Sequence, residues 1–212
     1  MPLQNRVDPF SRMHAVSACG LFTGNRGILH DPATKTLKHQ RWATEGWVIC
    51  TLEPLPGREK RPNLMLPSQW TELFFLDEAV GLAAGHRPCH ACRRERAIAF
   101  RDALGVDRIS KVNPRITGEM KGYLRARSPL PRPTCDPRAL PDGAFFAVGR
   151  NAYLKWRDAA YRFEFEDYDA PQKLPENGLR LTPEATCDAL RAGYMPILHP
   201  SISNTSSTHG FE

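Results

Sequence analysis

The spacing of hydrophobic residues predicts a β-rich first part of the chain. Short apolar pairs at residues 21–22 and 28–29 flank the turn-forming segment 24–27, a pattern that is typical of a β-hairpin. Residues 47–52 are apolar and β-prone, so they predict a strand, and Cys50 lies inside it. Up to this point the pattern indicates strands and loops rather than helices.

Helical periodicity begins after a further β-prone segment at residues 71–75. Asp77 is suited to accept backbone N–H groups at a helix start, and Gly85 suits the left-handed conformation that ends a helix. One face of this helix is apolar and consists of Leu76, Val80, Ala83 and Ala84. The pattern predicts a second helix near residues 91–104 and a third near residues 115–127. Two or three helices therefore surround a Cys-x-x-Cys turn.

Proline and aromatic residues organise the rest of the chain. Residues 128–143 contain five prolines and predict a semi-rigid linker after a first part that spans residues 1–127. Residues 144–200 predict a β-meander and a short helix at residues 182–192, and residues 201–212, rich in Ser and Thr, predict a disordered tail. The expected fold class is α+β: a β-rich N-terminal part, two or three helices around the Cys-x-x-Cys turn, and a C-terminal β-meander with a short helix.

The composition predicts a folded protein that keeps its cysteines reduced. The 212 residues are 41% hydrophobic, and no apolar run approaches the roughly 18 residues that a membrane span needs. No apolar stretch follows the first charged residues, so a secretory signal is not expected. These features predict a cytoplasmic protein, in which six cysteines serve a metal, redox or structural motif rather than a disulfide scaffold.

Basic residues are concentrated in the first part of the chain. Residues 1–130 carry 20 Lys and Arg against 12 Asp and Glu, and residues 131–212 carry 9 against 11. The densest part, residues 87–127, has 11 basic and 4 acidic residues. Such a segment can attract a phosphate backbone, or it can form a solvated surface without a partner. The first candidates for nucleic-acid contact are Arg87, Arg93, Arg94 and Arg96.

The turn that contains Cys89 and Cys92 is open to four interpretations. A zinc site needs four ligands, and a Cys-x-x-Cys turn supplies two thiolates. A redox pair at a helix start has a lowered thiol pKa, but no βαβ pattern surrounds this turn. The cysteines can also be small buried side chains without chemistry, or Cys89 can be a nucleophile with His86 or His90 as its base. Haem attachment is excluded, because Arg93 stands where a histidine is needed.

The motif AAGHRPCHACRR, which follows a predicted strand and helix, resembles the second half of the zinc-binding domain of Ada-type DNA repair proteins. The resemblance covers residues 72–94 and implies that Cys89 and Cys92 are the second ligand pair of a zinc site. The first pair of that family is incomplete here, because only Cys50, 39 residues before Cys89, lies in the equivalent region. We therefore expect Cys50 and His86 as the remaining zinc ligands. The other candidates for the fourth position are His90, His39, Cys135 and Cys19.

Over most of its length the chain is also similar to a set of uncharacterised bacterial proteins. The shared motifs are R-V-x-P-F near the start, G-N-R-G-x-L-H-D, T-E-L-F-F-L-D-E-A, G-H-R-P-C-x-x-C-R-R, and A-G-Y-x-P-x-x-H-P-S near the end. This similarity implies no known activity.

Three functions are compatible with these features. The first is a cytoplasmic nucleic-acid-associated protein, binding DNA or RNA, that carries zinc at the Cys-x-x-Cys turn. The second is an enzyme that acts on a small or phosphorylated substrate and draws its site residues from the cysteine turn and from Arg26, His30 and Asp31. The third is a partner-binding module whose interface is the proline-rich linker or the aromatic meander.

Overall fold

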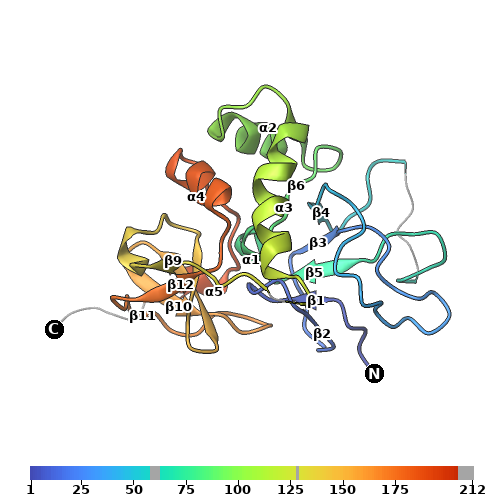
Figure 1. Ribbon diagram of the computed structural model, residues 1–212, viewed down its shortest axis with the longest axis horizontal. Helices are drawn as coiled ribbons and strands as arrows, with labels where there is room; N and C mark the ends of the chain where they lie inside the picture. Colours follow the sequence, from blue (N-terminus) through green and yellow to red (C-terminus); the bar gives the residue numbers. More distant parts are fainter. Residues whose placement is uncertain (58–62, 128, 205–212) are drawn as a thin grey trace.

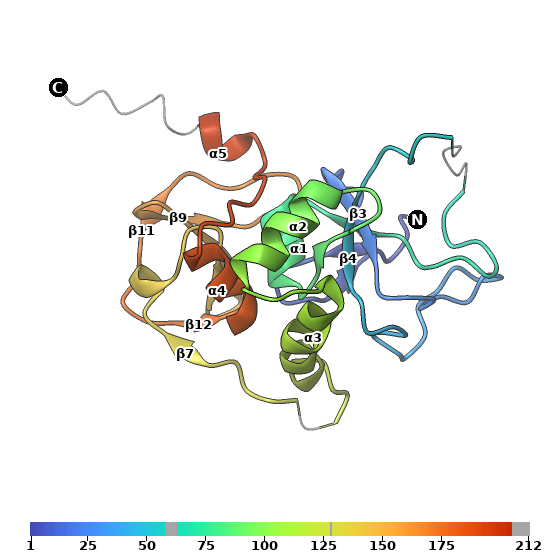
Figure 2. The same cartoon turned by 90° about the horizontal axis from the view of Figure 1, so that it is seen from above.

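The computed structural model describes residues 1–57, 63–127 and 129–204. Two six-stranded sheets lie at opposite ends of the molecule, and the helices are grouped between them and above them (Figure 1). Figure 2 shows the molecule from above, with most of the helices in the middle and the C-terminal helix at the edge. No helix in these described ranges is long and apolar enough to cross a membrane. The predicted α+β class is confirmed.

The N-terminal sheet is mixed and follows the order β2-β1-β5-β3-β4-β6. Its strands are β1 (Arg6–Val7), β2 (Met13–His14), β3 (Phe22–Asn25), β4 (Val48–Thr51), β5 (Leu73–Phe75) and β6 (Arg87–Pro88). β1 pairs in parallel with β5, and β4 pairs in parallel with β6, whereas the other pairs are antiparallel. The strands predicted at residues 47–52 and 71–75 are confirmed as β4 and β5.

The hairpin predicted around residues 24–27 is wrong. Gly24 and Asn25 continue β3, which pairs with β4 and β5 rather than with residues 28–29. At Gly24 the neighbouring strand approaches so closely that a Cβ atom would lie 2.1 Å from the carbonyl oxygen of Val48. This glycine therefore allows close strand packing and does not form a turn.

Three helices follow β5 and enclose the cysteine turn. They are α1 (Glu78–Ala83), α2 (Arg94–Ala103) and α3 (Val112–Tyr123), with the 3-10 helix η1 (Ile109–Lys111) before α3. As predicted, Asp77 caps α1 by accepting a hydrogen bond from the Val80 N–H, and Gly85 follows the helix with a φ of +85°. The third helix begins earlier than expected, because Pro114 lies in its first turn, where a missing N–H is tolerated.

The C-terminal sheet is antiparallel and follows the order β11-β10-β9-β8-β12-β7. Its strands are β7 (Thr134–Cys135), β8 (Phe145–Val148), β9 (Asn151–Trp156), β10 (Ala159–Arg162), β11 (Gln172–Lys173) and β12 (Gly178–Arg180). Strands β8 to β10 form the predicted meander, and the predicted short helix is α4 (Glu184–Arg191).

Two segments expected to be irregular contain regular structure. The proline-rich segment 128–143 includes β7, an edge strand of the C-terminal sheet, and the 3-10 helix η2 (Pro137–Ala139). The first four residues of the expected tail form α5 (Ser201–Asn204). The rest of that tail, residues 205–212, and residue 128 lie outside the described residues.

Helix α1 lies between the two sheets and joins them into one core (Figures 1 and 2). All six of its residues are buried, and one cluster of buried hydrophobic side chains continues from the N-terminal sheet through α1 into β8, β9 and α4. At the start of α1, Asp77 accepts hydrogen bonds from the Tyr168 hydroxyl at 2.8 Å and from the His199 N–H at 3.0 Å. The C-terminal segment is thus anchored to the helix that precedes the cysteine turn.

Candidate metal centre

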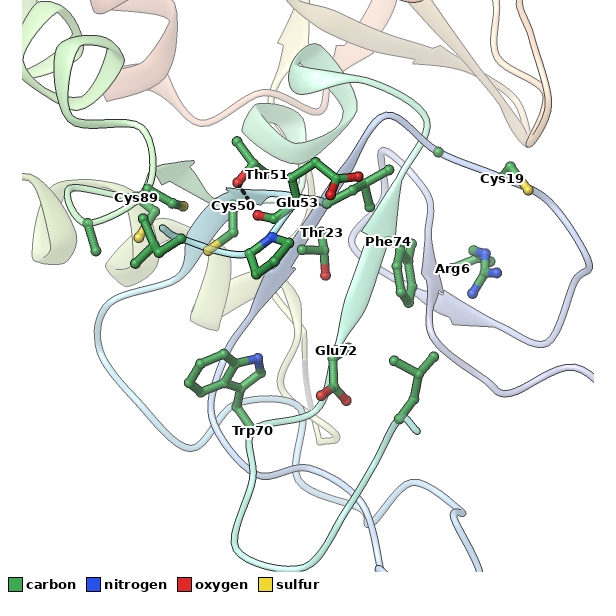
Figure 3. Close-up of a pocket in the computed structure, with 18 residues that line it drawn as sticks. Arg6, Cys19, Thr23, Cys50, Thr51, Glu53, Trp70, Glu72, Phe74 and Cys89 are labelled. Carbon is green, nitrogen blue, oxygen red and sulfur yellow. Dashed lines mark hydrogen bonds between the residues drawn. The ribbon is translucent and has the colours of Figure 1, made fainter. Parts of the chain in front are cut away.

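Three cysteines from two separate segments converge at one edge of the N-terminal sheet. The Sγ atoms of Cys50, Cys89 and Cys92 all lie within 4.8 Å of one another, and Figure 3 shows the side chains of Cys50 and Cys89 close together. Thiolates bound tetrahedrally to one zinc ion at about 2.3 Å lie roughly 3.8 Å apart, so small side-chain movements convert this arrangement into a zinc site. The cluster could therefore bind a metal such as zinc.

Backbone pairing between β4 and β6 brings the cysteines together. Cys50 lies in β4, and the parallel pairing continues beyond β6, where the Cys89 N–H donates to the Ile49 carbonyl at 2.9 Å. The Arg93 N–H donates to the Cys89 carbonyl at 2.9 Å and closes the turn that carries Cys92. Helix α2 starts at the next residue, so the turn is held by the sheet on one side and by a helix on the other.

The three thiols share hydrogen bonds, and this makes them unequal as acids. Hydrogen bonds from the thiols of Cys50 and Cys92, with further donation from the N–H groups of Cys92 and Ala91, lower the pKa of Cys89 well below its usual value. Hydrogen bonding to Cys89 and Cys92, together with burial, raises the pKa of Cys50. Metal binding requires deprotonated cysteine, so a cation that binds here would release protons from these thiols.

A cavity of about 520 Å³ lies beside the three cysteines, which form part of its wall. The larger apolar side chains on the wall are Leu52, Pro54, Leu55, Leu64, Trp70 and Phe74. The charged side chains on the described wall are Arg6, Glu53 and Glu72. Figure 3 shows Cys50 and Cys89 at one end of the cavity and Arg6 near the other. A cavity of this size accommodates a small molecule.

His86, expected as the fourth zinc ligand, is not brought to the cysteines. Its buried ring contacts Phe75 and Trp47, at centroid distances of 4.7 Å and 5.6 Å. Its Nε2 atom accepts a hydrogen bond from Arg26 at 3.2 Å, and burial together with the Arg26 charge lowers the pKa of His86 well below its usual value. His86 is thus a neutral core residue. Of the other candidates, His90, His39, Cys135 and Cys19, none joins the cluster within the described residues.

Most of the arginines expected to contact phosphate are engaged inside the protein. Arg93 and Arg96 each pair with the buried carboxylate of Glu78 at 3.0 Å. Arg87 is only 8% exposed and donates hydrogen bonds to neighbouring protein groups. Arg94 is the one exposed side chain of the four. The start of the basic segment is therefore largely an internal ion-pair network, because a carboxylate buried in α1 needs cationic partners.

The residues considered for an enzyme site have structural partners away from the cysteine cluster. Arg26 is fully buried and donates to Ser11 Oγ at 2.6 Å, and burial lowers the pKa of Arg26 to about 9. His30 is buried, with its Nδ1 atom 2.7 Å from Thr71 Oγ1. Asp31 is exposed and accepts two backbone N–H groups in the turn that follows it. These contacts give each of the three side chains a role in the folded structure that does not require catalysis.

Sequence reasoning missed three residues at or near the site. Trp70 and Glu72 line the cavity, and Glu78 anchors the arginines that follow the cysteine turn. Of these three, only Glu78 could have been predicted from the sequence. It is an acidic residue in a helix whose other residues are all small or apolar, so it is expected to need cationic partners. Trp70 and Glu72 reach the cavity through the position of β5 in the sheet, and no local pattern predicts that position.

Comparisons with protein-family models, with curated proteins and with solved structures find no match to this chain. The chemistry of the three cysteines and of the adjacent cavity is therefore the basis for inferring function.

Proposed function

We propose that the protein binds zinc through Cys50, Cys89 and Cys92. The observation that carries this proposal is the convergence of three Sγ atoms within 4.8 Å, although Cys50 and Cys89 are 39 residues apart in the sequence. Zinc prefers thiolate ligands, and a Cys-x-x-Cys turn supplies two of them at a suitable spacing. The third ligand comes from a neighbouring strand that is fixed by hydrogen bonds to the same turn.

The distribution of cysteines supports a metal role. Three of the six cysteines meet at one point, whereas Cys19, Cys135 and Cys187 lie outside the cluster. A cysteine that serves only core packing is buried, as Cys187 is, but the three clustered thiols are only partly buried. A cytoplasmic setting belongs to the proposal, because it keeps thiols reduced. The resemblance of residues 72–94 to the second half of the Ada-type zinc domain supports the same ligand pair.

Elemental analysis of the untagged protein tests this proposal. We expect about one zinc ion per chain in the wild type and roughly a tenth of that or less in Cys50→Ser and Cys89→Ser, because each variant removes one of three ligands. The matched control is Cys19→Ser, which removes an exposed cysteine that lines the same cavity but lies outside the cluster. This control should keep the zinc content of the wild type.

Two results would contradict the zinc proposal. The first is wild-type protein that takes up no zinc even when the metal is added under reducing conditions. The second is equal zinc content in Cys50→Ser and the wild type. A disulfide between Cys89 and Cys92 in metal-free protein would instead favour the redox interpretation of the turn.

Association with nucleic acid is a second candidate, supported by exposed basic residues on α2 and around α3. They include Arg94, Arg108, Arg125 and Arg127. We expect labelled DNA or RNA to bind at low salt and to dissociate as the salt concentration rises, because phosphate contacts release counterions. Arg94→Ala should weaken this binding, whereas Arg150→Ala, an exposed arginine in the C-terminal part, should not. Absence of binding at low salt would contradict this candidate.

A further inference from the structure

We infer that the cavity beside the cysteines binds a small, neutral nitrogen heterocycle whose ring nitrogen supplies the fourth ligand to the zinc. This inference rests on the proposed zinc site and adds the class of molecule that reaches the metal.

Zinc held by the three cysteines has one coordination position left. Across residues 1–57, 63–127 and 129–204, no fourth His, Cys, Asp or Glu side chain joins the group. Zinc in proteins is usually four-coordinate, and sites with three protein ligands take a water molecule or a substrate in the fourth position. Cys50, Cys89 and Cys92 all line the cavity, so a molecule in the cavity has direct access to the metal.

The cavity wall favours a flat aromatic body. Trp70 is 40% exposed although it is a large aromatic residue, and Figure 3 shows its ring at the border of the cavity, on the side of Cys50. Phe74 borders the cavity further from the cysteines, with the Arg6 guanidinium 4.6 Å from the centre of its ring. Aromatic rings stack against such surfaces, and about 520 Å³ fits a molecule of one or two rings.

The charge of the metal centre disfavours an anionic ligand. The described lining has the carboxylates of Glu53 and Glu72 and the guanidinium of Arg6, and Glu72 already accepts a hydrogen bond from the Met65 N–H at 2.9 Å. Arg6 is already engaged, because it donates hydrogen bonds to the Ala18 carbonyl and to the Asn5 side chain. A zinc ion with three thiolates adds one net negative charge. A phosphate group that coordinates the metal therefore meets repulsion from this centre, whereas a neutral nitrogen donor does not.

Cobalt substitution gives a spectroscopic readout of the fourth ligand. Co²⁺ is bound by the same kinds of ligand as zinc, and its visible absorption bands depend on its coordination. We expect 4-phenylimidazole to shift these bands and to bind about tenfold more tightly than imidazole, since the cavity removes its phenyl ring from water. Trp70→Ala should weaken binding of 4-phenylimidazole about tenfold and leave imidazole binding unchanged. The matched control is Trp42→Ala, which removes a tryptophan outside the cavity and should alter neither affinity.

Each alternative outcome decides a separate point. Cobalt bands that neither azole moves would show a closed metal site, which overturns this inference and leaves the zinc proposal intact. Equal affinity of the wild type and Trp70→Ala for 4-phenylimidazole would show that the ligand does not occupy the cavity. Tighter binding of phenyl phosphate than of 4-phenylimidazole would contradict the charge argument. Failure to bind cobalt or zinc at all would overturn the proposed function itself.

Discussion

Replacing Glu78 by alanine is expected to lower the free energy of unfolding by about 3–5 kcal/mol. The Glu78 side chain is fully buried. Its Oε1 atom lies 3.0 Å from the Arg93 guanidinium, and its Oε2 atom lies 3.0 Å from the Arg96 guanidinium. The same carboxylate accepts hydrogen bonds from the Tyr194 hydroxyl and the Ile197 N–H. Alanine would leave the Arg93 guanidinium, whose side chain is 3% exposed, without its anion. The cost arises mainly from this uncompensated buried charge.

Denaturant unfolding followed by circular dichroism measures this effect. The matched control is Glu95→Ala, which removes an exposed carboxylate from the first turn of α2 and should change stability by about 0.5 kcal/mol or less. Both variants should retain zinc while they are folded, because neither residue belongs to the cysteine cluster. A loss below about 1 kcal/mol for Glu78→Ala would show that the buried network does not stabilise the fold as described.

Removing zinc is expected to lower the thermal midpoint of the wild-type protein by about 5–10 °C. A ligand present at about 100 times its Kd that binds only the folded state stabilises it by about 2.7 kcal/mol, and each kcal/mol corresponds to about 2–4 °C in a chain of this size. Unfolding breaks the β4–β6 pairing that holds Cys50 beside Cys89 and Cys92, so the unfolded chain loses the metal site. Cys50→Ser should therefore have a midpoint that neither zinc nor a chelator changes.

Thermal scans with added zinc and with a chelator check this prediction. Cys19→Ser is again the matched control and should respond to zinc and to the chelator as the wild type does. A zinc response of the same size in Cys50→Ser would place the stabilising metal elsewhere in the protein.

The cysteine turn could be predicted because its determinants are local. Asp77 and Gly85 mark the two ends of α1, and the turn follows within a few residues. The position of Cys50 depends instead on parallel pairing of β4 with β6, a long-range contact that hydrophobic periodicity does not encode. His86 is close to the turn in sequence but packs in the core against Trp47, so sequence proximity was a poor guide to the fourth ligand.

Charge counts along the chain predicted function less well than hydrophobic periodicity predicted the fold. The arginines after the cysteine turn form a basic run in the sequence, yet Arg93 and Arg96 point to Glu78, an acidic residue of another helix. A count over neighbouring residues cannot detect a partner that the tertiary fold supplies. The same limit explains why the hairpin prediction at residues 24–27 was wrong. A glycine is needed at position 24 because β4 approaches closely there, and not because the chain turns.

X-ray absorption spectroscopy at the zinc edge of the wild-type protein tests the central claim most directly. The three-cysteine centre predicts three sulfur ligands at about 2.3 Å and one nitrogen or oxygen ligand at about 2.0–2.1 Å. Four sulfur ligands, or fewer than three, would contradict a centre built from Cys50, Cys89 and Cys92.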